Sequence, residues 1–374
     1  MFKKISCAAI AAALLLSVVG CGANTGTTSS NAASSASQAA SDAGSTAASS
    51  QPTASAAKTI QVTDSTGKSI EIAQPLQRVV TFNSGLYDCM CALGVDATLV
   101  GRGSSLVIDG KDIPDVGAWD APNIEVILEI APEAVFAYAG KITPEDEKIL
   151  GNSGIHCIYL EMTKADRIVE EYQTLAKLFG KEEKAKTYLD LNQKYTDLLA
   201  ERLSDLKEGE RRTIYYEGYS DYTSVNKTAG GQTLIDMAGG INIAAEEEAA
   251  YPEISDEWLL ENNPNMILKL ISSTNKEVFG ETVTDAQKAQ KEYEKLLSRP
   301  GWKDMQAVKD GNVLLLSGTI STNALGSIVG SVYMAKALYP ERFQDLDPQK
   351  VHEEIYTALH GEPLTGLWAY QPTV

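Results

Sequence analysis

Polar, aromatic and basic side chains follow several short β-rich segments of this chain, where they could bind a ligand without covalent chemistry. In the first half of the chain these residues are Asn83, Ser84, Tyr87, Arg102, Trp119, Tyr138 and Lys141. In the second half they are Tyr216, Tyr219, Tyr222, Lys269, Thr319, Thr322 and Asn323. Aromatic rings offer flat amphipathic faces to a macrocycle or a catecholate, and basic side chains can contact an anionic chelate. We predict that these residues bind the ligand, although surface decoration is an equally good interpretation of Tyr219 and Tyr222.

Patterns typical of catalysis and of bare metal binding are missing from the sequence. It contains no Gly-x-Ser-x-Gly, His-Glu-x-x-His or Walker loop, which disfavours a surface hydrolase, and we predict no catalytic residue. The three histidines, His156, His352 and His360, lie in a predicted strand and near the C-terminus. We therefore predict no site for bare zinc or manganese and no cofactor. A ligand that already carries its metal as a chelate needs no such set of side chains, and a ferric chelate held directly by tyrosine oxygen stays open.

The elements that must position these side chains alternate between strand and helix. Short β-rich runs such as Arg78–Phe82 are followed by helical segments, and the alternation restarts in the second half. Between the halves, apolar residues at helical spacing predict a long helix over 163–180. Thr163 can cap its start and Gly180 can terminate it.

This pattern predicts an α/β fold made of two Rossmann-like lobes. The first lobe spans 58–162, the helix over 163–180 connects the lobes, and the second lobe spans 181–374. In open α/β sheets ligands bind beyond the carboxyl ends of the strands. We therefore expect a ligand cleft between the two lobes.

The N-terminal segment predicts where the protein works. Lys3 and Lys4 precede a short apolar run, so residues 1–20 read as a secretory signal. The cysteine that follows, Cys21, resembles the lipidated cysteine of a bacterial lipoprotein, and two acyl chains anchor a protein stably. The rest of 21–57 is rich in Ser, Ala and Thr, which is typical of a disordered tether. We expect an extracytoplasmic protein that contacts the cell membrane only through its lipid anchor.

Charge and cysteine content narrow the range of partners. The formal net charge of −18 disfavours nonspecific binding to nucleic acid or to anionic lipid. Beyond the N-terminal segment the cysteines are Cys89, Cys91 and Cys157, an odd number, so a disulfide scaffold is not predicted. For Cys89 and Cys91, small buried apolar residues are a better interpretation than a redox or metal-binding pair. We expect a monomer that does not bind nucleic acid.

Several local patterns, in order over about 59–360, resemble the substrate-binding proteins of ABC importers for iron–siderophores, haem and cobalamin. Those patterns are Val62–Gly67 with Gln77–Val80, Ala92–Gly94, Leu99–Gly101, Val116–Gly117, Asn123–Glu125, Ala131–Phe136, Gly239–Asn242, Ile254–Glu257, Asn263–Leu268, Trp302, Ala307–Val313 and Ala335–Phe343. The resemblance implies two rigid lobes, one connecting helix and limited hinge motion. It also implies that the protein delivers an iron or cobalt chelate to a membrane permease.

The resemblance further implies a docking role for two glutamates, Glu125 in the first lobe and Glu257 in the second. In that family one glutamate on each lobe contacts arginines of the permease, and exposed charges of this kind orient an encounter. The alternative is that each carboxylate only favours the first turn of a helix. The loop over 317–326 lacks the arginine often found in siderophore binders, so a weakly charged cobalamin-like ligand, an oxyanion such as molybdate, or a sensory role stays open.

Overall fold

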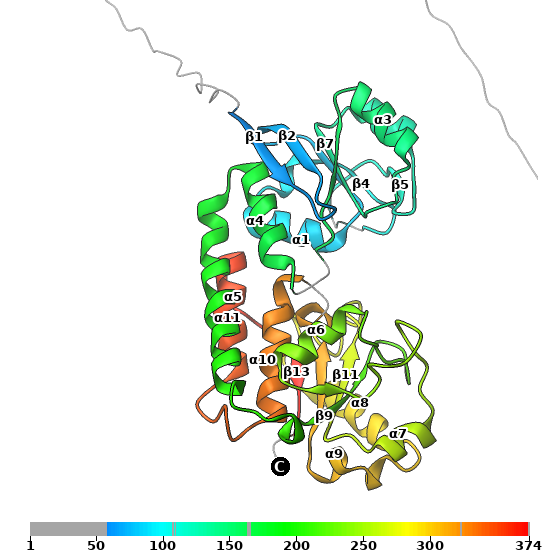
Figure 1. Ribbon diagram of the computed structural model, residues 1–374, viewed down its shortest axis with the longest axis vertical. Helices are drawn as coiled ribbons and strands as arrows, with labels where there is room; N and C mark the ends of the chain where they lie inside the picture. Colours follow the sequence, from blue (N-terminus) through cyan, green and yellow to red (C-terminus); the bar gives the residue numbers. More distant parts are fainter. Residues whose placement is uncertain (1–57, 107, 109, 163–165, 322–323, 373–374) are drawn as a thin grey trace, which may run out of the picture. The chain divides into compact units, whose positions relative to one another are not determined.

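Four short parallel strands form the sheet of the first lobe, in the order β4-β3-β7-β8 (Figure 1). The computed structural model describes residues 58–106, 108, 110–162, 166–321 and 324–372. The strands are β3 (Val79–Thr81), β4 (Leu99–Arg102), β7 (Ala134–Ala137) and β8 (His156–Tyr159), and the helices are α1 (Ser84–Leu93), α2 (Ile124–Ile130) and α3 (Pro144–Asn152). Strands β3 and β7 are buried along their whole length, as expected where helices cover both faces of a parallel sheet.

Two antiparallel hairpins complete the first lobe. The first pairs β1 (Lys58–Thr63) with β2 (Ser69–Gln74) across a turn that includes Gly67. The second, β5 (Gly117–Ala118) with β6 (Ala121–Pro122), is very short and presents Trp119 at its turn.

The second lobe holds a five-stranded sheet in the order β10-β9-β11-β12-β13, in which only β13 is antiparallel to its neighbour. Its strands are β9 (Thr213–Glu217), β10 (Ile241–Asn242), β11 (Met266–Ile271), β12 (Val313–Ser317) and β13 (Ala369–Tyr370). Its helices are α6 (Gly230–Met237), α7 (Asp256–Asn262), α8 (Gln287–Leu297), α9 (Gln306–Lys309), α10 (Ser327–Leu338) and α11 (Pro348–His360). The predicted α/β class with two parallel sheets is confirmed.

The connection between the lobes differs from the single predicted helix. Two helices follow the first lobe, α4 (Ile168–Phe179) and α5 (Glu182–Leu203). Gly180 ends α4 in the left-handed conformation as predicted, with φ 61°, whereas the predicted cap Thr163 lies outside the described residues. The 22 residues of α5 give it a length of about 33 Å.

Helix α5, rather than α4, reaches from one lobe to the other. A Cβ atom added to Gly94 of the first lobe would lie 2.9 Å from Nζ of Lys184, near the start of α5. A Cβ added to Gly239 of the second lobe would lie 3.1 Å from Leu203, at the end of α5. Along the rest of its length α5 packs beside α10 and α11 (Figure 1).

Glu171 fixes the start of the connection. Its carboxylate is buried and accepts a hydrogen bond from the backbone N–H of Met162 at 2.7 Å and another from the hydroxyl of Ser65. The guanidinium of Arg167 donates to the carbonyl of Ser65 at 2.8 Å. These bonds tie the exit of the first lobe to the β1–β2 turn.

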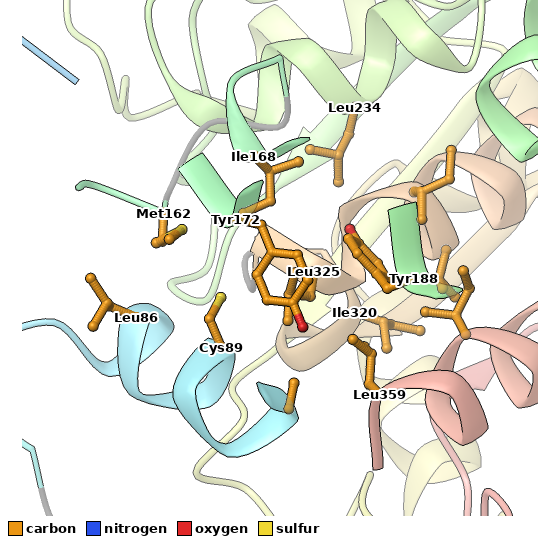
Figure 2. Packing of buried hydrophobic residues seen from close by; sticks show 14 of the residues in the cluster. Leu86, Cys89, Met162, Ile168, Tyr172, Tyr188, Leu234, Ile320, Leu325 and Leu359 are labelled. Atoms are coloured by element: carbon orange, nitrogen blue, oxygen red, sulfur yellow. The ribbon is translucent and has the colours of Figure 1, made fainter. Parts of the chain in front are cut away.

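The two lobes share one hydrophobic core. Its largest cluster joins Leu86 and Cys89 of α1 to Tyr172 of α4, Tyr188 of α5 and Leu359 of α11 (Figure 2). The rings of Tyr172 and Tyr188 meet edge to face, with centroids 5.3 Å apart. Motion between the lobes is therefore limited by apolar contacts as well as by the connecting helices.

None of the three described cysteines, Cys89, Cys91 and Cys157, forms a disulfide bond. Cys89 is buried, as predicted for a small apolar residue, whereas Cys91 is only half-buried, and Cys157 is buried. Burial raises the pKa of the Cys157 thiol to about 12.

The membrane-related predictions fall on residues that the structure does not describe. The proposed signal, Cys21 and the tether all lie within 1–57, outside the described ranges. No helix within those described ranges combines the length and apolar character needed to cross a bilayer.

His352 makes the stability of this fold sensitive to acid. It is 4% exposed on α11, its ring packs edge-on against Trp368, and burial lowers its pKa to about 4. An unfolded imidazole titrates near pH 6.5, so between pH 6.5 and 4 the unfolded chain binds a proton that the folded chain does not. Stability is therefore lost as the pH falls through this window.

We predict that His352→Gln removes about 2 kcal/mol of the stability difference between pH 7 and pH 5. The measurement is urea unfolding of the wild-type and variant chains at both pH values. The same pH dependence in the two chains would show that His352 is not the responsible group.

Candidate functional site

Three of the predicted residues form one aromatic group in the first lobe. Trp119, at the β5–β6 turn, is 41% exposed and contacts the ring of Tyr138 edge to face, with centroids 5.6 Å apart. The ammonium of Lys141 lies 4.6 Å from the centroid of the Trp119 ring. Burial, reinforced by the Glu161 carboxylate, raises the pKa of Tyr138, so its phenol stays neutral. The group presents an apolar face next to a positive charge.

Arg102 lies at the end of β4 beside an acidic residue. Its guanidinium is 3.7 Å from the carboxylate of Asp115 and donates a hydrogen bond to the carbonyl of Gly103. The backbone N–H of Gly117 and the hydroxyl of Ser104 also donate to Asp115, and together they lower its pKa. Asp115 therefore offsets part of the positive charge that Arg102 brings to this edge of the sheet.

The residues at the start of α1 are placed mainly for structure. The side chain of Asn83 is buried, caps the helix at the N–H of Leu86, and donates to the carbonyl of Glu161 at 2.5 Å. Tyr87 is half-buried, and burial raises the pKa of its phenol. Ser84 is exposed, so it is the member of this group that presents its side chain most openly.

A buried ionic cluster occupies the end of β9 in the second lobe. The fully buried carboxylate of Glu217 lies 2.9 Å from the ammonium of Lys269 and 2.8 Å from the guanidinium of Arg299. Asp221 contacts the same two cations at 3.2 and 2.8 Å. Lys269 also donates to the carbonyls of Gly218 and Tyr219, at 2.9 and 3.2 Å. This departs from the prediction that Lys269 contacts the ligand, because its charge is used inside the loop that follows β9.

Tyr216 and Tyr222 are also engaged inside the lobe. Tyr216 lies in β9 with its ring buried in the core, and its hydroxyl bonds with Ser321. The ring of Tyr222 packs on Trp302, with Arg299 4.4 Å from its centroid, and burial raises its pKa to about 12. Neither ring is presented as the sequence analysis expected. Sequence reasoning missed Arg299, because it follows a helix rather than a strand.

Two tyrosines remain exposed in the second lobe. Tyr219 is 47% exposed and lies against Gly318, where an added Cβ would collide with the Tyr219 ring. Tyr251 is 65% exposed, and both tyrosines lie close enough to the Tyr216 hydroxyl to influence its ionisation. The sequence analysis missed Tyr251, whose only signal is a lone aromatic in an acidic, alanine-rich loop.

The hydroxyl-rich loop after β12 is described in part. Thr319 is half-buried, and Thr322 and Asn323 lie outside the described residues. Within the described part of the chain, no group of three or more His, Cys, Asp or Glu residues is placed to hold a metal ion.

Glu125 and Glu257 occupy equivalent positions in the two lobes. Each is exposed in the first turn of a seven-residue helix, α2 or α7. Asn123 caps α2 and Ser255 caps α7, and each helix ends at a residue in the left-handed conformation. The two lobes thus present one carboxylate each in the same local setting.

Comparison with known proteins relates this architecture to one group. A family model described as "Periplasmic binding protein" matches residues 79–318. The molybdate-binding protein MolA of Haemophilus influenzae is 23% identical over 332 residues, which is 79% of this chain and 89% of that protein. A vitamin B12-binding protein of Yersinia pestis is 25% identical over 212 residues, which is 55% of this chain and 73% of that protein.

Solved structures show the same fold. The TroA-like periplasmic binding protein FepB from Veillonella parvula superposes with a TM-score of 0.72 at 22% identity, over 84% of this chain and 100% of that one. The molybdate-bound structure of MolA gives a TM-score of 0.64 at 22% identity, over 82% of this chain and 99% of that one.

We predict that breaking the ionic cluster around Glu217 destabilises the second lobe. Glu217→Gln leaves Lys269 and Arg299 buried with one negative charge fewer, and breaking a buried pair in this way costs about 3–5 kcal/mol. Asp190→Asn, which breaks the exposed pair with Lys186, should cost far less, because exposed ion pairs contribute little to stability. Urea unfolding measures both, and equal small losses would contradict the structural role of the cluster.

Proposed function

The chain belongs to the periplasmic binding protein family, and from this premise we propose that it captures an iron or cobalt chelate and delivers it to a permease. Proteins of this family are non-enzymatic, extracytoplasmic substrate-binding components of ABC importers. The chelate we propose is a siderophore complex, haem or a cobalamin, with a weakly charged and partly aromatic or macrocyclic ligand as the best fit.

The exposed aromatic residues carry this proposal. Trp119 in the first lobe and Tyr219 and Tyr251 in the second are large apolar side chains left in solvent by a fold that buries most others. Tyr219 follows β9 directly, and Trp119 contacts Tyr138, which follows β7, so both rings lie near the carboxyl ends of strands of the two main sheets. Flat amphipathic rings in such positions can stack on a macrocycle or on aromatic chelating groups.

The charges that remain near these rings favour a weakly charged ligand. Lys269 and Arg299 are held by Glu217 and Asp221, and Arg102 lies beside Asp115. Lys141 is the cation that the structure places directly on an exposed ring. A highly charged anion would approach an acidic protein against an unfavourable field.

An oxyanion such as molybdate is the second candidate ligand. The likeness to a molybdate-binding protein covers 79% of this chain, and hydroxyl side chains such as Thr319 can donate to an oxyanion. The exposed aromatic rings have no role in binding so small an ion, which is why we rank it second.

We also propose that the protein is held at the membrane through lipid on Cys21. The order of a short apolar segment, Cys21 and a tether rich in Ser and Ala supports this proposal. Mass spectrometry of the mature protein would test it, because diacylation adds a defined mass to the N-terminal peptide.

A ligand panel on the full chain tests the chelate proposal. The panel contains ferric siderophores, haemin, cobalamins, divalent metal ions and molybdate, and a ligand at one hundred times its Kd should add about 2.7 kcal/mol to stability in thermal unfolding. Trp119→Ala and Tyr219→Ala should each raise the Kd for the chelate about tenfold or more. Ile149→Ala, which removes another exposed apolar side chain, is the control and should change nothing. A response to molybdate alone would favour the second candidate.

The equivalent positions of Glu125 and Glu257 support a docking role for these two residues. The double substitution Glu125→Gln/Glu257→Gln should reduce cellular uptake of the ligand at least tenfold, because both contacts that orient the complex are lost. The Kd for the ligand, measured by calorimetry, should stay the same. The matched control is Glu129→Gln/Glu261→Gln, one helical turn further along the same two helices. Normal uptake by the first double variant would show that the docking assignment is wrong.

A further inference from the structure

The two lobes repeat one local pattern in front of each candidate docking carboxylate. Trp119 lies six residues before Glu125, and Tyr251 lies six residues before Glu257. In both lobes the exposed ring is followed by a short antiparallel pairing and then by a capped seven-residue helix, α2 or α7. Isolated helices of this length are marginal in water, so contacts with the rest of the lobe must hold each one in place.

The first residue of the helix differs between the lobes. In α2 it is Ile124, and in α7 it is Asp256. The half-buried carboxylate of Asp256 accepts a hydrogen bond from the indole N–H of Trp302 at 3.2 Å and another from the hydroxyl of Tyr222. Hydrogen bonds to a charged group are stronger than those between neutral groups. Because Trp302 is fully buried, its bond joins the start of α7 to the core of the lobe.

The two rings that donate to α7 also contact the buried ionic cluster at the end of β9. The Arg299 guanidinium lies 4.4 Å from the centroid of the Tyr222 ring and 4.6 Å from that of the Trp302 ring. The same guanidinium is 2.8 Å from the carboxylates of both Glu217 and Asp221. A cation is attracted to an aromatic face, and more strongly where water is excluded. The start of α7 is therefore connected to the cluster through two aromatic side chains.

Backbone hydrogen bonds join the same two segments. The N–H of Ile254 donates to the carbonyl of Tyr222 at 2.8 Å, and the N–H of Ser224 donates to the carbonyl of Pro252 at 2.9 Å. The segment just before α7 thus pairs with the loop after β9, which also presents Tyr219. The start of α7 and this loop form one unit that is held by backbone and side-chain bonds together.

The position of Glu257 depends on this unit. Glu257 is exposed and follows directly after Asp256 in the first turn of α7. Exposed charges of this kind act by orienting an encounter, which requires that the charge stay at one place on the surface. Asp256 bonds to the interior while its neighbour faces solvent, so the bonds of the first fix the backbone that carries the second.

We propose that Asp256 is a positioning residue for the docking carboxylate Glu257. It joins the start of α7 to the loop after β9 through its bonds with Trp302 and Tyr222. This inference rests on the docking role proposed for Glu257. In the first lobe, the local β5–β6 hairpin leads directly into α2. In the second lobe, the pairing segment comes from a loop distant in sequence, and the bonds of Asp256 supply the additional connection.

Hydrogen–deuterium exchange of the full chain tests the positioning without a ligand or a permease. Asp256→Ala removes the acceptor of both bonds, so we expect exchange at least tenfold faster both in 254–263 and in 222–226. Tyr222→Phe removes one donor and keeps the ring, so we expect a smaller increase, about threefold, in the same two segments. Asp256→Asn keeps a carbonyl oxygen that can accept from Trp302 and should restore most of the protection.

The matched control is Asp304→Ala, which removes an exposed carboxylate two residues after Trp302. It should leave exchange in both segments unchanged, and exchange in α2 should be the same in every variant. Faster exchange in α7 alone would show that Asp256 stabilises only its own helix. Unchanged exchange in both segments would show that the two bonds do not hold it, and equal effects of Asp256→Asn and Asp256→Ala would assign the effect to charge. Each of these three results would overturn the proposal.

Cellular uptake separates the role of Asp256 from the docking assignment itself. The probes are radiolabelled cyanocobalamin, haemin and ferrichrome, each at saturating concentration so that ligand capture is not limiting. Glu257→Gln and Asp256→Ala should each lower uptake at least threefold, whereas Asp256→Asn and Asp304→Ala should not. Reduced uptake with Glu257→Gln and normal uptake with Asp256→Ala would overturn the positioning role and leave the docking assignment in place. Normal uptake with Glu257→Gln would count against the docking assignment, and the exchange result would still show whether Asp256 holds α7.

Discussion

The rest of the molecule depends on the hydrophobic core that the two lobes share. Within this core, the rings of Tyr172 and Tyr188 meet edge to face. Both rings are buried between helices that belong to different parts of the chain, α1, α4, α5 and α11 (Figure 2). Separating the lobes would expose apolar surface to water, at a free-energy cost of about 25 cal/mol for each Å². The shared core and the bonds of Glu171 therefore oppose separation of the two lobes.

In the second lobe, buried charged side chains stabilise the loop that follows β9. Glu217 and Asp221 neutralise Lys269 and Arg299, and Tyr222 covers the cluster. The ligand surface that we propose for this lobe therefore relies on aromatic and hydroxyl side chains such as Tyr219, Tyr251 and Thr319. The charges of Lys269 and Arg299 are therefore used to stabilise the loop. This agrees with the proposed preference for a weakly charged chelate.

Much of the architecture could be predicted from local patterns, whereas the site could be predicted only in part. The β1–β2 hairpin, the alternation of strands and helices and the end of a helix at Gly180 all follow from turn residues and short-range periodicity. The grouping of Trp119, Tyr138 and Lys141 follows from their places at strand ends. The roles of Lys269 and Tyr251 could not be predicted, because one depends on Arg299 and Glu217, distant in sequence, and the other on a loop without periodicity.

The sequence by itself determined the α/β class, the two lobes and the acidic character of the protein, because these depend on composition and on neighbours a few residues away. Tertiary structure alone decided that α5 spans the lobes, that Lys269 is buried in an ionic cluster, and that Asp256 accepts a hydrogen bond from Trp302. These outcomes depend on which side chains meet across long separations in the chain. The burial of a side chain and the charges around it depend on these long-range contacts, so they cannot be predicted from the residues adjacent in sequence.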